Sequence, residues 1–253
     1  MTKTSREVFV EPSVEEAAGL ASKFVKEVIC EAVEQRGACY LALAGGTTPH
    51  GLYLRLAADG ITGNVPWQNV VVFFGDERDV PQDHAESNYL MAQRTLLDHV
   101  PIDLKHVHPM PADADDLQAA AAAYEKTIRR IVPAEGGGVP RFDLILLGMG
   151  GEGHTASLFP DTEALQERSR LVMTCFVPVL GRSRITITYP LINAARCVIL
   201  FVTGGDKAAG VACLLGDDEE ARGRLPASGV APTDGRMIVI LDSAAARAAD
   251  LKQ

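Results

Sequence analysis

The sequence has few cysteines and no apolar run long enough to span a membrane. Only 5 of its 253 residues are cysteine, and no two of them form a CxxC pair. Isolated cysteines in apolar surroundings indicate reduced thiols in a reducing compartment. The apolar runs fall short of the roughly 18 residues of a membrane helix. The opening stretch MTKTSREVFVEPSVEE lacks the basic and then apolar pattern of a secretory signal. We therefore expect a cytoplasmic protein with no membrane partner.

Positive charge is also scarce. The chain has 24 Lys and Arg against 33 Asp and Glu, a net charge of −9. Such a chain has no electrostatic attraction to nucleic acid or to anionic membranes, so we expect neither as a partner. A phosphorylated ligand would need a few cations gathered locally. No internal repeat divides the chain, and we expect a single domain over residues 1–253, as a monomer.

Several familiar site motifs are missing. There is no GK[ST] phosphate loop, no GxSxG and no HExxH, and His106 and His108 have no further ligand frame around them. We therefore expect no metal and no cofactor. Gly148, Gly150 and Gly153 formally satisfy GxGxxG. However, no acidic residue ends the next expected strand, about 20 residues on, as a dinucleotide site requires.

Short apolar runs alternate with longer helical patterns along the chain. Runs such as VVVFF and LILL are typical of strands buried on both faces. The expected strands are residues 7–10, 39–44, 69–74, 142–147, 172–177, 184–188, 197–202 and 236–241. The expected helices are residues 14–35, 86–99 and 116–132, with another beginning after Thr48. This alternation predicts a three-layer α/β fold, with a mainly parallel sheet and helices on both faces.

Three finer local features accompany this pattern. Ser13 and Glu16 fit a capping box before the first helix. Thr48 and Pro49 fit an N-cap followed by proline at the first helical position. The stretch EGGGV at residues 135–139 predicts a flexible loop.

Ligands of parallel sheets bind beyond the carboxyl ends of the strands, so the residues directly after each strand are the candidates for a site. Gly45 and Gly46 allow a ligand close to the backbone, and Thr47 adds a hydroxyl near a helix N-terminus. A tight turn with a helix cap explains the same residues without a ligand.

Three cations lie in what we expect to be separate loops after strands: Arg78 in GDER, Arg184 in RSRITIT and Lys207 in GGDK. A guanidinium binds phosphate with a fork of donors, and a lysine binds it as a point charge. Each cation alone fits a solvated surface residue equally well. As a set, they predict a phosphate site in an acidic protein.

His154 lies in the glycine-rich turn GMGGEGHT, directly after an expected strand. A neutral imidazole, with an ordinary pKa near ~6.5, accepts a proton from water at cellular pH. Glu152 can orient the ring or favour its protonated form. We expect Asp76 to be a polar or electrostatic group beside the reacting carbon. Ser157 is an alternative nucleophile, although it lacks the usual elbow motif.

The ordered set of motifs resembles the 6-phosphogluconolactonase family, which shares its fold with the glucosamine-6-phosphate deaminases. The motifs are LAGGTTP, GDERDVP followed by SNY, GMGGEGHTASLFP, RITITYPLIN, GGDKA and LPAS. The resemblance extends from about Ala42 to Ala245. It implies a Rossmann-like fold of the sugar-phosphate isomerase and deaminase type. It also implies metal-independent hydrolysis of a phosphorylated sugar lactone, 6-phospho-D-glucono-1,5-lactone, in the oxidative pentose phosphate pathway.

The resemblance also implies roles for individual residues. His154 is the base in the family's [DE]GH element, where this chain has Glu152 in place of the commoner Asp. The implied substrate-binding residues are Gly45, Gly46, Thr47, Arg78, Arg184 and Lys207. Two alternatives stay open: an enzyme resembling glucosamine-6-phosphate deaminase or isomerase, and a non-catalytic sugar-phosphate sensor. A sensor usually carries a DNA-binding segment, and no basic helix-turn-helix extension is present here.

Overall fold

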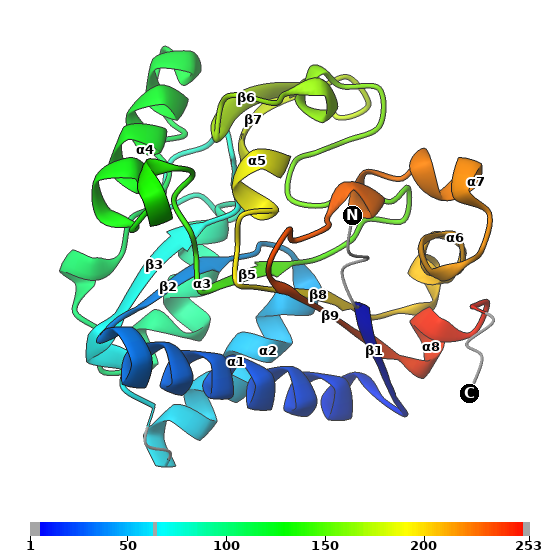
Figure 1. Ribbon diagram of the computed structural model, residues 1–253, viewed down its shortest axis with the longest axis horizontal. Coiled ribbons are helices and arrows are strands. Elements are labelled where there is room, and N and C mark those ends of the chain that lie inside the picture. The colour runs from blue at the N-terminus through cyan, green and yellow to red at the C-terminus, as the bar shows by residue number, and fades with distance from the viewer. Residues whose placement is uncertain (1–5, 63–64, 250–253) are drawn as a thin grey trace.

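The computed structural model describes residues 6–62 and 65–249, and its centre is a six-stranded parallel sheet (Figure 1). The strand order is β1-β9-β8-β5-β2-β3, and every neighbouring pair is parallel. The strands are β1 (Arg6–Glu11), β2 (Cys39–Leu43), β3 (Val70–Phe74), β5 (Leu144–Leu147), β8 (Cys197–Val202) and β9 (Arg236–Asp242). All residues of β3, β5 and β8 are buried, as expected for strands covered on both faces.

Helices and a small second sheet cover the two faces. Figure 1 shows α1 and α2 along one face, with α4, α5 and the β6–β7 pair on the other side. The α-helices are α1 (Val14–Arg36), α2 (Thr47–Thr62), α3 (Asn88–Thr95), α4 (Leu117–Ile131), α5 (Tyr189–Ile192), α6 (Ala208–Leu215), α7 (Glu219–Gly223) and α8 (Ser243–Ala246). The predicted three-layer α/β fold with a mainly parallel sheet is confirmed.

Two of the expected strands belong to the second sheet instead of the parallel one. This sheet is antiparallel, in the order β4-β7-β6, with β4 (Asp76–Arg78), β7 (Arg182–Ile187) and β6 (Val172–Val177). Only four residues separate β6 from β7. Parallel neighbours need a crossover of about a dozen residues or more, so this short link allows only a hairpin.

The helix starts depend on side-chain caps. Ser13 caps α1, because its Oγ accepts the backbone N–H of Glu16 at 3.1 Å. α2 begins at Thr47, two residues before the expected first helical residue Pro49, so Thr48 lies within the helix and is not its N-cap. The expected helix 86–99 is shorter, because Ser87 caps α3 and a separate 3-10 turn occupies Leu97–His99.

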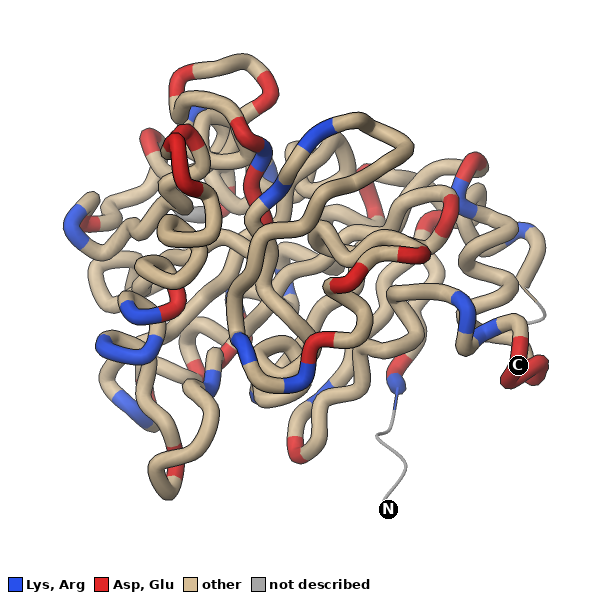
Figure 2. Tube along the Cα trace, turned by 90° about the horizontal axis from the view of Figure 1, so that it is seen from above, with Lys and Arg blue, Asp and Glu red and all other residues tan. Residues whose placement is uncertain are grey.

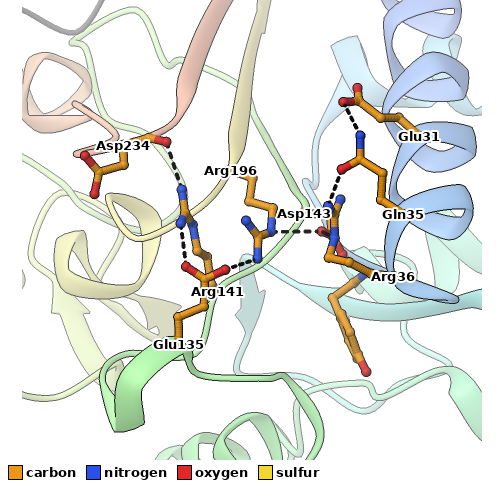
Figure 3. A network of polar contacts seen from close by, with 9 residues as sticks. Glu31, Gln35, Arg36, Glu135, Arg141, Asp143, Arg196 and Asp234 are labelled. Atoms are coloured by element: carbon orange, nitrogen blue, oxygen red, sulfur yellow. Dashed lines mark hydrogen bonds and ion pairs between the residues drawn. The ribbon is translucent and has the colours of Figure 1, made fainter.

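A network of charged side chains joins the amino ends of the central strands (Figure 3). The buried Asp143 accepts hydrogen bonds from Arg36 Nε and from the backbone of Tyr40, both at 2.9 Å, and lies 3.3 Å from Arg196 Nε. Glu135, in the segment expected to be a flexible loop, pairs with Arg141 and Arg196. The network lies at the edge of the sheet opposite to the predicted site.

Candidate active site

A cleft of about 320 Å³ lies at the carboxyl ends of β2, β3 and β5. The residues that the sequence singles out come from five separate stretches of chain, namely the loops after β2, β5 and β8 and the strands β4 and β7 of the second sheet. The fold brings all of them to the wall of this cleft. They are Gly45, Gly46, Thr47, Asp76, Arg78, Glu152, His154, Arg184 and Lys207.

The glycine-rich turn after β5 presents His154 to the cleft. The backbone N–H of Gly150 donates to the carbonyl of His154 at 2.9 Å, and that of Gly153 donates to Gly150 at 3.0 Å. The hydroxyl of Thr155 donates to the carbonyl of Gly148 at 2.8 Å, which closes the turn onto the end of the strand. Gly153 has a φ of 86°, in the left-handed region that favours glycine.

The His154 ring is held from two sides. Nδ1 lies 2.9 Å from Oε1 of Glu152, and the ring stacks on Phe159 with centroids 4.0 Å apart. The contact with Glu152 has hydrogen-bond distance, although the N–H direction is not in line with the oxygen. Catalytic pairs often align fully only in the substrate complex. A carboxylate at Nδ1 favours the proton on that nitrogen, which leaves Nε2 able to act as a base.

Glu152 is suited to remain ionised. Burial raises its pKa, but a hydrogen bond from its own backbone and the neighbouring His154 and Lys207 lower it, and the net pKa shift is downward. Glu152 is therefore a carboxylate at neutral pH and can stabilise positive charge on the imidazole.

Asp76 is the first residue of β4 and is almost buried, with 9% of its surface exposed. Its Oδ2 accepts the hydroxyl of Ser157 at 2.7 Å, and its Oδ1 accepts Nδ2 of Asn88 at 3.2 Å. Ser157, which the sequence offered as a nucleophile, instead donates its proton to a carboxylate and is 1% exposed. Sequence reasoning did not assign Asn88 or Phe159, because neither lies directly after a strand.

The sequence predicted that Arg78 and Arg184 lie in separate loops, and this prediction is wrong. They are directly opposite each other on the antiparallel strands β4 and β7. Like charges at such a position destabilise a sheet. Nε of Arg184 is buried and has no hydrogen-bond partner within the described part of the chain. Burial lowers the pKa of Arg184, Asp76 partly opposes this, and Arg78 lowers the pKa further. A bound anion would compensate this concentration of positive charge.

Lys207 lines the cleft from the loop after β8, whereas the two arginines belong to the second sheet. It ends the 3-10 turn Gly205–Lys207 after β8, and its Nζ lies 2.8 Å from Oδ2 of Asp206. Its charge also acts on Glu152. Basic and acidic segments intermix along the chain trace (Figure 2), so the gathering of Arg78, Arg184 and Lys207 is a local feature of this cleft.

The turn between β2 and α2 forms a further wall. Gly46 has a φ of 97°, and Thr48 shares a hydrogen bond with Thr203 of the β8 loop at 3.0 Å. A Cβ added to Gly45 would lie 1.8 Å from Oδ1 of Asn88, so only glycine leaves room for that amide.

The described part of the chain has neither a group of side chains arranged to hold a metal ion nor a helix that could span a membrane. Within residues 6–62 and 65–249, no group of three or more His, Cys, Asp or Glu side chains is arranged to hold a metal ion. No helix in these same ranges combines the length and apolar character needed to span a membrane.

The chain is similar to known proteins over most of its length. Residues 12–239 match the model of the family described as glucosamine-6-phosphate isomerases/6-phosphogluconolactonase. A 6-phosphogluconolactonase of Synechocystis sp. is 41% identical, over 86% of this chain and 87% of that protein. The Mycobacterium leprae 6-phosphogluconolactonase is 39% identical, over 90% and 93%. The solved 6-phosphogluconolactonase of Trypanosoma brucei has a TM-score of 0.84 at 29% identity, covering 97% of this chain and 99% of that one.

Proposed function

Because the chain belongs to the glucosamine-6-phosphate isomerase/6-phosphogluconolactonase family, we propose that it hydrolyses 6-phospho-D-glucono-1,5-lactone to 6-phosphogluconate, a step of the oxidative pentose phosphate pathway. Relatives 41% and 39% identical carry the name of this activity. The observation that carries the proposal is the shared cleft, in which the His154–Glu152 pair and the arginine pair lie together.

His154 acts as the general base in this proposal. Its Nε2 removes a proton from water as the water attacks the lactone carbonyl carbon. The resulting imidazolium, stabilised by Glu152, then protonates the departing ring oxygen and opens the ring. The N–H groups of Gly150 and Gly153 are bonded within the turn. We propose that other N–H groups of the turn donate to the developing oxyanion.

The cations bind the phosphate and so place the reacting carbon. Arg78 and Arg184 supply forked donors from adjacent strands, and the unpartnered Nε of Arg184 supports this role. Lys207 adds a point charge to the same cleft, and Gly45, Gly46 and Thr47 line it. Binding energy from a remote phosphate is used for orientation at the reacting carbon.

A coupled assay with freshly generated lactone tests the function. Wild-type protein should exceed the spontaneous rate measured without enzyme, and His154→Ala should lower kcat by about 10²–10⁴-fold. His99→Ala, which removes an exposed histidine that does not line the cleft, is the control and should keep wild-type kcat. A wild-type rate equal to the spontaneous rate would refute the proposal. Release of ammonia from glucosamine 6-phosphate would favour the deaminase instead.

A further inference from the structure

Asp76 places a negative charge in a cleft whose proposed substrate is an anion. A carboxylate there repels phosphate and loses hydration through burial, so it needs a compensating partner. The hydrogen bonds to its carboxylate come from the neutral donors Ser157 and Asn88, one to each carboxylate oxygen. Neither donor neutralises the charge, which instead interacts with the Arg184 guanidinium on the adjacent strand. The two neutral donors hold the carboxylate as a hydrogen-bond acceptor at the wall of the cleft.

Three segments of chain, which contain Ser157, Thr186 and Asn88, hold this carboxylate in one orientation. Ser157 donates its hydroxyl to Asp76, and its backbone N–H donates to Oγ1 of Thr186 at 3.1 Å. Thr186 is the β7 residue opposite Asp76. Ser157 follows Ala156, which has a φ of 48°, a conformation that costs energy in a residue other than glycine. The turn that carries Ser157 is thus fastened to β4 and β7, two neighbouring strands of the second sheet.

Asn88 fixes the other oxygen. Its Nδ2 donates both to Oδ1 of Asp76 and to the backbone carbonyl of the same residue, at 3.2 and 2.9 Å. The backbone N–H of Asn88 donates to the buried Glu77 at 2.8 Å. Each carboxylate oxygen accepts about two hydrogen bonds. Ser157 and Asn88 therefore leave acceptor positions on Asp76, which lines the cleft.

We propose that Asp76 accepts a hydrogen bond from a ring hydroxyl of the sugar, and that Ser157 and Asn88 are positioning residues that aim it. Asp76 would then determine specificity for hydroxyl-bearing phosphorylated rings over deoxygenated ones. This inference rests on the proposed function for the substrate class, but its main test measures binding and needs no turnover.

The test uses 1,5-anhydroglucitol 6-phosphate, a stable ring without the lactone carbonyl, together with its 2-, 3- and 4-deoxy analogues. Calorimetry gives Kd for wild type, Ser157→Ala and Asp76→Asn. In wild type, at least one deoxy analogue should bind roughly 10- to 100-fold more weakly than the parent, the range for a hydrogen bond to a charged group. In both variants this ratio should fall below about threefold, because the acceptor is misdirected or its charge is lost.

A matched control separates positioning from simple loss of stability. The buried Ser22 also donates its hydroxyl to a carboxylate, that of Asp59, at 2.9 Å, and neither residue lines the cleft. Ser22→Ala should keep the wild-type ratio of affinities. Asp76→Asn should in addition bind inorganic phosphate more tightly, since a negative charge is removed. Asp76→Asn also decides the question if Ser157→Ala does not fold.

Lactone kinetics add a readout that a purely structural role would not change. Ser157→Ala should raise KM by about 10-fold with kcat within about twofold, as expected for a contact made equally in ground and transition states. A kcat loss above about 10⁴-fold would make Ser157 a nucleophile and would overturn the proposal.

The two hypotheses fail in different ways. If wild type distinguishes the deoxy analogues but does not hydrolyse the lactone, only the proposed function fails. If wild type hydrolyses the lactone and binds every analogue as it binds the parent, only the role of Asp76 is refuted. A ratio that survives in Asp76→Asn also refutes that role. Failure of the parent ligand to bind would overturn the role of Asp76, while the lactone assay would still decide the proposed function.

Discussion

Replacing Gly150 by alanine should displace the His154 ring and so disable it, although His154 itself is unchanged. A Cβ on Gly150 would lie 2.1 Å from Nδ1 of His154 and 2.7 Å from Oε2 of Glu152, where ordinary contacts begin at 3.4 Å. The imidazole must therefore retreat by about 1 Å or more. A displacement of this size costs about 10²-fold in rate, or about 2.7 kcal/mol of transition-state stabilisation.

The assay compares Gly150→Ala with Gly151→Ala in lactone hydrolysis. The neighbouring Gly151 is the matched control, because a Cβ there meets nothing nearer than the carbonyl of Asp206 at 3.6 Å. Gly150→Ala should lose about 10²-fold in kcat, while Gly151→Ala should stay within about threefold of wild type, since its added methyl meets only an ordinary contact.

A double variant tests whether the effect passes through the imidazole. Gly150→Ala combined with His154→Ala should be no slower than His154→Ala alone, because effects of residues that act as one unit do not add. Additive losses, or equal losses in Gly150→Ala and Gly151→Ala, would refute the reasoning.

Three further predictions follow from single contacts. Arg184→Ala should weaken the binding of inorganic phosphate by about 10-fold or more in calorimetry. Arg182 does not line the cleft, so Arg182→Ala should change the Kd for phosphate by less than about threefold. Equal effects of the two substitutions would contradict the phosphate-binding role of Arg184. Backbone N–H groups and Arg170 lower the pKa of Glu167 to about 2, below its ordinary 4.5, so its stabilisation is present above pH 4.5 and lost as the pH falls towards 2. Glu167→Gln should therefore have a lower Tm than wild type at neutral pH, with the difference closing over that range, and a difference independent of pH would be the contrary result. Asp143→Ala, at the opposite edge of the sheet, should lose about 3 kcal/mol in urea unfolding while KM stays unchanged, and a raised KM would show that the two edges are coupled.

The sequence alone determined the strands of the central sheet, and it predicted the edge of the sheet at which a ligand would bind. Strands buried on both faces must be continuously apolar, so β3, β5 and β8 are visible as hydrophobic runs. Glycines after a strand and a capping residue before a helix are also local features, because each follows from the backbone conformation of a few neighbouring residues. His154 could be selected for the same reason, since its glycine-rich turn directly follows β5.

Only the tertiary structure decided which side chains meet. Ser157 and Asp76 are 81 residues apart, and their hydrogen bond depends on how the turn after β5 lies against the second sheet. The pairing of Arg78 with Arg184 depends on the register between β4 and β7. A shift by one residue would move every side chain of a strand to the other face. Such a register is set by packing across the whole molecule, which no local pattern in the chain specifies.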